Sequence, residues 1–302
     1  WEDTKMEFSA TAGTAGGSLK ALFEVRDGDN LENFKGKVTK ADSYSLTVEN
    51  ISIDNIKSLN LPDKDGKITV NNISYSYDSW EAQVDAQGNI KSVTFNLSKD
   101  KAIADPEKTV AEGYLLNAGS AINARGIPYY MTQLNEFVRN FSEMFNQIES
   151  KGQNLNGDTP PTFFEAITNT AKVYDFSESE AYSKLPDGQT ATINSSSNTY
   201  YRMTAANFSV NKDVMNDVSL FATSTDYVKT DSCDIVDELK KLQSEKTVYR
   251  GDKAESFLET IISNVSVDTE KAETYNKLYS NLEQTIANQR TSVSGVDEDE
   301  EA

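Results

Sequence analysis

The sequence predicts an α+β fold: an elongated helical-bundle domain with an inserted, mainly antiparallel β domain. Two periodicities in the 302 residues predict it. Apolar residues recur every three or four positions near both ends and in the middle of the chain, whereas from 33 to 101 they alternate with polar residues. The discontinuous helical body is expected to comprise 1–32 and 102–302, with an irregular or β segment at about 158–225, and the inserted β domain 33–101.

The first predicted helix follows a stretch of small residues at 9–18. Leu19, Leu22 and Phe23 fall on one helical face, and Gly28 offers an end to the helix. This segment is expected to form the N-terminal part of the helical body.

Alternating residues between 33 and 101 predict four to six short antiparallel strands, with one polar face. Turn-forming residues separate them at 62–66 and 85–89. The apolar members of the pattern are Tyr44, Leu46, Val48, Ile51, Ile53, Ile73, Tyr75, Tyr77, Trp80, Ala82, Val84, Val93, Phe95 and Leu97.

Two helices are predicted after the β region. The first begins at Asp105-Pro106, since proline suits the first helical position, and its apolar face runs as far as Ile122. The second follows Ile127-Pro128 and ends before Gly152. Its apolar stripe consists of Leu134, Phe137, Val138, Phe141, Met144, Phe145 and Ile148. Packing inside the bundle is the favoured interpretation of this stripe, and acceptance of a partner's helix is the alternative.

The last fifty residues predict a helix, a short break and a longer helix. Asp252 and Glu255 form a capping pair before the first helix, and Asp268 can cap the second, which runs to about Val293. Apolar residues at three- and four-residue spacing give the long helix one stripe, which needs a partner along its length. The candidate assembly residues are Tyr275, Tyr279, Leu282, Ile286, Arg290 and Val293.

The composition argues against nucleic acid and membranes as partners. The chain has 29 Lys and Arg against 48 Asp and Glu, a net charge of −19. Such a surface repels nucleic acid and anionic lipid. No apolar run has the length of a membrane span.

Several kinds of catalysis are excluded by residue content. The chain has no histidine and one cysteine, Cys233, so it cannot by itself form a Ser-His-Asp triad or a His-Glu-x-x-His zinc site. Asp63, Asp65 and Gly66 resemble half of a calcium loop, but Asn72 stands where the bidentate Glu is required, so a turn is favoured. No catalytic residue, cofactor or metal site is predicted.

Three segments, in order along the chain, resemble the flagellar hook-associated proteins. The first is Gly-Gly-Ser-Leu-x-x-Leu-x-x-x-Arg-Asp at 16–27. The second is the Ile-Pro helix from 127 with the glycines and Phe-Phe that follow it, as far as 164. The third combines Ala-Asn-x-Ser-Val-Asn at 206–211 with the polar and acidic run at 288–301. One departure is Glu298, where the family has an apolar residue, often Leu.

The resemblance implies a structural component of the bacterial flagellum, a junction subunit between hook and filament, without enzymatic activity. It implies an extracellular location after export by the flagellar secretion apparatus, and a role in flagellum assembly and motility. The implied partners are other copies in a ring, the hook protein, the second junction protein, and an export chaperone that binds a region beyond the C-terminal end of this chain. The terminal coiled-coil regions of the family are expected to lie outside it.

Two alternatives remain open at this stage. One keeps the class and makes the chain a flagellin or another flagellar axial subunit. The other is a secreted carbohydrate-binding module or enzyme housed in the β domain, which would need exposed aromatic rings at Tyr75, Tyr77 and Trp80.

Overall fold

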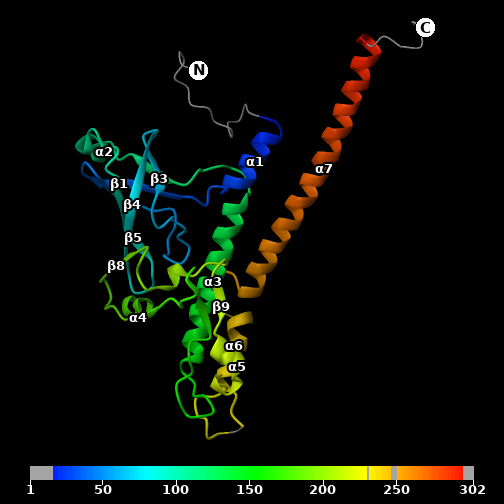
Figure 1. The fold of residues 1–302 in the computed structure, drawn as a ribbon. Coiled ribbons are helices and arrows are strands. Elements are labelled where there is room, and N and C mark those ends of the chain that lie inside the picture. The colour runs from blue at the N-terminus through cyan, green and yellow to red at the C-terminus, as the bar shows by residue number, and fades with distance from the viewer. Residues whose placement is uncertain (1–15, 230, 246–249, 295–302) are drawn as a thin grey trace. The chain divides into compact units, whose positions relative to one another are not determined.

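The computed structural model describes residues 16–229, 231–245 and 250–294 (Figure 1). The chain divides into two compact units, Trp1–Ala254 and Glu255–Ala302. The described part of the first unit contains all the strands and the shorter helices, and that of the second is the long helix α7 (Ala254–Ser294).

The core of the first unit is a closed, six-stranded antiparallel barrel. The barrel has the order β3-β6-β1-β2-β5-β4 and closes because β4 also pairs with β3. A further strand, β8, extends the sheet beside the second half of β4. The strands are β1 (Phe34–Ala41), β2 (Ser45–Glu49), β3 (Gly66–Val70), β4 (Ile73–Val84), β5 (Ile90–Leu97), β6 (Leu115–Ala118) and β8 (Ala191–Asn194).

In strand β4 the buried residues change from odd-numbered to even-numbered positions. Its inward residues are odd-numbered as far as Tyr77 and even-numbered from Trp80 onwards. The pairing of β4 with β5 shifts register between Tyr77 and Ser79, so one extra residue is accommodated there. This irregularity lets one long strand pair with β3 through its first half and with β8 through its second.

The barrel interior is filled by apolar side chains from every strand. Phe95 is fully buried, and its ring centroid lies 5.4 Å from that of Phe34 and 5.1 Å from that of Tyr77. Trp80 is also fully buried, and its ring packs edge-on against Tyr201 at 5.0 Å. The core therefore continues from the barrel into the segment around Tyr201.

The predicted fold class, an elongated helical bundle with an inserted antiparallel β domain, is wrong. A closed barrel dominates the first unit, and the described helices do not form an elongated bundle. The predicted range 33–101 supplies five of the strands, but the barrel closes only through β6, which lies beyond it.

Strand β6 lies where a helix was expected. The helix that starts at Asp105-Pro106 ends at Ala111, and Gly113 follows with a φ of +56°. Leu116 and Ala118 then point into the barrel, whereas Leu115 is exposed. Three- and four-residue apolar spacing over so short a segment is compatible with either structure, and the long-range pairing of β6 with β1 and β3 decides between them.

Helix α3 packs against α1 and α6, whereas α2 packs against β1. The helices are α1 (Gly17–Asp27), α2 (Pro106–Ala111), α3 (Ile127–Glu149), α4 (Ser177–Ser183), α5 (Lys212–Asn216) and α6 (Asp234–Ser244), with 3₁₀ turns η1 (Tyr200–Arg202) and η2 (Val218–Leu220). A small antiparallel pair, β7 (Phe164–Ala166) and β9 (Phe208–Val210), also belongs to the first unit.

Two glycines join the end of α1 to the start of α3. Gly126 N–H donates to the Gly28 carbonyl at 3.0 Å, and Asp29 bridges to Arg125 beside them. A Cβ atom on either glycine would lie 2.3 Å from the Glu24 carbonyl oxygen. Only glycine allows the backbones to approach so closely, so the chain enters and leaves the barrel segment at one point.

The C-terminal segment is one continuous helix, so the predicted break before Asp268 is wrong. Helix α7 has 41 residues, about 60 Å at 1.5 Å per residue. The segment around Asp268 contains no glycine or proline. Ser266 and Thr269 instead donate hydrogen bonds to carbonyls one turn back, at Ile262 and Val265.

Across the described residues, no helix combines the length and the apolar character needed to cross a membrane.

Candidate functional site

The predicted assembly residues all lie on α7 and are exposed. The five apolar residues among them range in exposure from 48% at Ile286 to 87% at Val293. The rings of Tyr275 and Tyr279 lie 6.3 Å apart, one turn from each other. The described part of this unit is the helix alone, so within it no other element covers Tyr275, Tyr279, Leu282, Ile286 or Val293.

The spacing of these residues is that of a coiled coil. Alternate steps of three and four residues continue over eight intervals, which is the 3.5-residue period of a heptad repeat. We call these positions the α7 seam: Val265, Asp268, Ala272, Tyr275, Tyr279, Leu282, Ile286, Gln289 and Val293. Arg290 lies next to the seam and does not belong to the repeat. The seam is readable in the sequence, but its full length becomes clear only when the helix is known to be unbroken.

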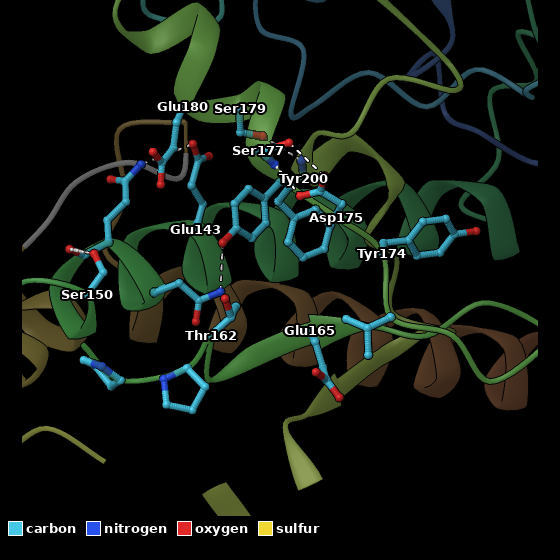
Figure 2. A pocket seen from close by; sticks show the side chains of 16 residues that line it. Glu143, Ser150, Thr162, Glu165, Tyr174, Asp175, Ser177, Ser179, Glu180 and Tyr200 are labelled. Carbon is cyan, nitrogen blue, oxygen red and sulfur yellow. Dashed lines mark hydrogen bonds between the residues drawn. The ribbon is translucent and has the colours of Figure 1, made fainter. Parts of the chain in front are cut away.

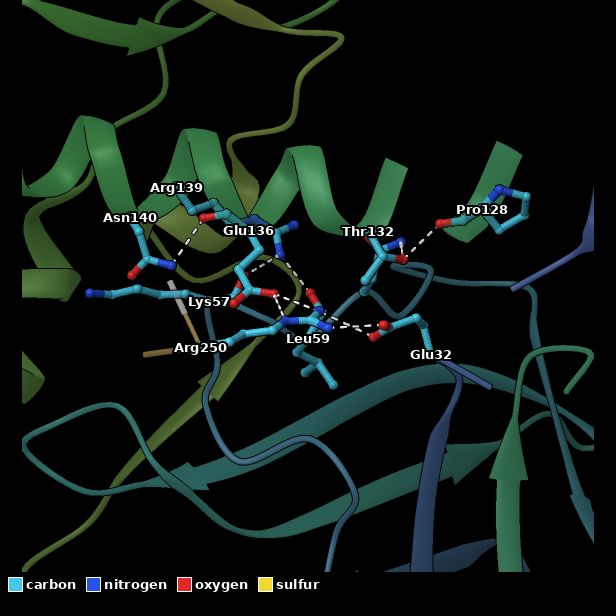
Figure 3. Close-up of polar contacts among 10 residues, drawn as sticks. Glu32, Lys57, Leu59, Pro128, Thr132, Glu136, Arg139, Asn140 and Arg250 are labelled. Atoms are coloured by element: carbon cyan, nitrogen blue, oxygen red, sulfur yellow. Dashed lines mark hydrogen bonds and ion pairs between the residues drawn. The ribbon is translucent and has the colours of Figure 1, made fainter. Parts of the chain in front are cut away.

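The first unit contains a second distinctive surface, the polar face of α3, and this one is buried (Figure 3). Arg139 is 2% exposed and donates to three backbone carbonyls, those of Met203 at 2.8 Å, Lys57 at 3.0 Å and Leu59 at 2.5 Å. Burial lowers its pKa to about 10. The guanidinium therefore ties α3 to the loop after β2 and to η1.

Arg250 links the residues just before α7 to the barrel side of α3 (Figure 3). It donates to Glu136 at 2.8 Å and to Glu32 at 2.9 Å. Burial opposes its charge, but the hydrogen bonds to both carboxylates outweigh it and raise the pKa of Arg250. Nearby, Lys57 Nζ lies 2.6 Å from Glu143 Oε2. These ion pairs are internal and form part of the structure of the first unit.

The predicted apolar stripe of α3 packs within the first unit along its second half. Phe141, Met144 and Phe145 pack against Ile235 and Leu242 of α6. The rings of Phe141 and Phe145 also contact Phe164, at 5.7 and 4.7 Å. Internal packing therefore accounts for this part of the stripe.

An open cleft of about 350 Å³ lies beside α3, β7 and α4 (Figure 2). Four carboxylates line it, and so do three aromatic side chains, Tyr174, Phe176 and Tyr200. The carboxylates belong to Glu143, Glu165, Asp175 and Glu180. These four carboxylates could not be predicted as a group from the sequence, because acidic residues are frequent throughout the chain and nothing in their spacing brings them together.

Glu149, at the end of α3, is another buried carboxylate. It is 2% exposed, and its Oε1 accepts from the Ala222 N–H at 2.6 Å, whereas Oε2 has no hydrogen-bond partner among the described residues. Burial raises the pKa of Glu149 to about 7, although the hydrogen bond from Ala222 opposes the rise. The charged form is thus disfavoured in the folded protein.

The aromatic residues that a carbohydrate-binding β domain would need are core residues. Trp80 and Tyr77 are fully buried, and Tyr75 is 7% exposed. Trp80 Nε1 and the Tyr77 hydroxyl both donate to the Pro62 carbonyl. These three rings therefore cannot stack on a sugar in this structure.

The structure also shows the positions of the calcium-like turn and of Cys233. Gly66 begins β3, and no group of three or more Asp, Glu, Cys or His side chains among the described residues is arranged to hold a metal ion. Cys233 is exposed, directly before α6. The acidic run at 297–301, including Glu298, and the start of the small-residue stretch at 9–15 lie outside the described residues.

Comparison of the chain with known protein families, with curated proteins and with solved structures found no match.

Proposed function

We propose that this chain is a structural subunit of the bacterial flagellum and that it acts at the junction between hook and filament. The observation that carries the proposal is the α7 seam, an exposed heptad repeat that no described residue of its own unit covers. The three sequence segments that resemble the hook-associated proteins supply the biological setting.

The seam requires a partner for energetic reasons. An isolated helix is marginally stable in water, since most helix stability in proteins comes from packing of an apolar face. Fully burying a large apolar side chain contributes about 1.5 to 3 kcal/mol. Tyr275, Tyr279, Leu282 and Ile286 are about half exposed, so burying the rest of all four contributes on the order of 3 to 6 kcal/mol. These contacts favour assembly and offset part of the entropy cost of association.

The occupant that fits the seam is another helix with the same period, and α7 of a neighbouring copy provides one. Two helices with the same heptad repeat can pack along their length in the knobs-into-holes arrangement of a coiled coil. The polar seam residues Asp268 and Gln289 would restrict the register of this pairing.

The alternatives differ in what supports them. A flagellin or another axial subunit would use the same seam, so only the location of the protein in the flagellum separates this alternative from the junction subunit. A carbohydrate-binding β domain loses the aromatic residues on which it was based, because Tyr75, Tyr77 and Trp80 are buried.

The test is complementation in the bacterium that encodes the chain, with the full-length gene. The double substitution Leu282→Asp and Ile286→Asp places two charges in the α7 seam. We expect cells that make hooks but carry no attached filaments, counted by electron microscopy, and that do not swim.

A matched control carries the same added charge on the opposite face of the helix. Asn281→Asp with Gln284→Glu changes two exposed positions outside the seam and is expected to restore filaments and swimming. Normal filaments in the seam variant, or equal loss in both variants, would contradict the proposal.

A further inference from the structure

The cleft beside α3 contains one carboxylate that the folded chain leaves without a partner. Glu165 lies on β7, is 6% exposed and lines the cleft (Figure 2). Within the part of the chain that the structure describes, no hydrogen bond or ion pair reaches this carboxylate. Neither carboxylate oxygen is fully enclosed by the protein, so both are accessible to a ligand from the cleft.

The other acidic residues of the cleft are already engaged. Glu143 pairs with Lys57 at 2.6 Å, and Glu180 pairs with Lys184 at 3.2 Å. Asp175 accepts from the Ser177 N–H at 2.9 Å. Among the described residues, no lysine or arginine lines the cleft, and Lys212 lowers the pKa of Glu165 from a distance without forming an ion pair with it.

The walls of the cleft suit the carbon stem of an organic cation. Phe176 and Tyr200 stack with their ring centroids 4.2 Å apart, and Pro160 and Pro161 also line the cleft. Tyr174 already carries the Arg202 guanidinium over its ring at 4.2 Å, so this aromatic wall is compatible with a cationic group. The volume of about 350 Å³ is at the lower end of the range for small-ligand pockets.

A bare metal ion fits the cleft less well. Calcium needs about six to eight oxygens at short range, and no three acidic side chains among the described residues are grouped to provide them. The cleft combines carboxylates with apolar walls. An elongated molecule with an aliphatic stem and a cationic end can contact both kinds of group.

We propose that this cleft binds an alkylammonium or guanidinium group with an aliphatic stem, and that Glu165 is its charge partner. The cation is either a lysine or arginine side chain of another protein or a free polyamine. In support, burial and the nearby charge of Asp213 raise the pKa of Glu165, against the influence of Lys212, as expected for a carboxylate that lacks a bound cation. This site is separate from the α7 seam and does not rest on the flagellar proposal.

The experiment is an NMR titration of the chain with Nα-acetyl-lysine amide, Nα-acetyl-arginine amide and spermidine, using the uncharged Nα-acetyl-norleucine amide as the reference ligand. We expect the backbone amide signals around Glu165 and Asp175 to shift with at least one cation and not with the norleucine compound. Binding of the amino-acid amides alone identifies a protein side chain as the source, and tighter binding of spermidine identifies a polyamine.

Variants make the test specific. Glu165→Gln keeps the shape of the side chain and is expected to weaken binding at least tenfold, whereas Glu107→Gln, an exposed change on α2, leaves the affinity unchanged. Glu180→Gln, at an exposed position on the cleft, is expected to weaken binding about two- to threefold, and it provides a second readout should Glu165→Gln not fold. Equal shifts with the norleucine compound, no shift with any cation, or full affinity in a folded Glu165→Gln variant would overturn the proposal.

Discussion

The barrel buries its apolar side chains, whereas the long helix α7 exposes most of its own. In the barrel, Phe95, Trp80 and Leu46 are fully buried by other residues of the same unit. On α7, Leu282 and Ile286 are about half exposed, and no described side chain of their own unit covers them. The barrel therefore draws its stability from its own contacts, whereas the seam is available for contacts with other molecules.

Phe95→Ala should have the largest effect on stability. It removes a fully buried ring that contacts Phe34 and Tyr77, so we expect a loss of about 3 to 5 kcal/mol in the free energy of unfolding. Urea unfolding followed by circular dichroism measures it. Leu115→Ala, on the exposed side of β6, is the control and should cost less than about 1 kcal/mol. Similar losses for both would mean that the barrel interior is not the main source of stability.

Arg139→Met should cost about 2 to 4 kcal/mol, because three buried carbonyls lose their donor. The same urea experiment applies, with Arg26→Met as the control at an exposed arginine of α1, expected to change stability by less than about 0.5 kcal/mol. A neutral result for Arg139→Met would show that the buried polar face of α3 does not hold the barrel to the helix.

Glu149 should make stability depend on pH. The pKa of Glu149 in the folded protein is about 7, above its value in the unfolded chain, so between about pH 4.5 and 7 the folded state binds the additional proton. Stability from this group is complete at low pH and is lost as pH rises through 7.

Glu149→Gln removes this titration, and we expect it to increase the free energy of unfolding at pH 8 by about 1 to 3 kcal/mol. Unfolding measured from pH 4.5 to 8 should give a flatter profile than the parent protein. The exposed Glu49→Gln variant should keep the parental profile. A parental slope in Glu149→Gln would place the titration elsewhere.

Leu282→Ala should have the smallest effect on the unassembled chain. Since Leu282 is 50% exposed, we expect a change within about 0.5 kcal/mol in the free energy of unfolding at low protein concentration. A loss above about 2 kcal/mol would show that the seam is already buried in the single chain.

Local structure was well predicted where one periodicity runs for many residues. Helices α1 and α3 and the alternating residues of β2, β4 and β5 follow their patterns. The barrel was missed because closure depends on β3 pairing with β6, which lies some fifty residues later in the chain. The α7 segment was predicted as helical, but a break was placed at Asp268, where a residue typical of helix caps stands inside a continuous helix.

The candidate sites also differ in whether they are formed by one local segment or by distant segments. The α7 seam is a local repeat, and the sequence predicted its apolar residues from Tyr275 to Val293. It did not predict Val265, Asp268, Ala272 or Gln289, and it added Arg290, which lies outside the repeat. The cleft of Glu165 and the buried face of α3 are formed by residues from distant segments, and polar residues on α3 have no property in the sequence that distinguishes buried ones from exposed ones. Arg139 and Glu165 could therefore be recognised only from the structure.

The most direct test of the central claim is to locate the protein on the flagellum. Antibodies raised against the folded chain, detected with gold particles on flagella sheared from the bacterium that encodes it, report its position by electron microscopy. The account predicts a short labelled band between hook and filament. Labelling along the whole filament, or flagella without label, would contradict it.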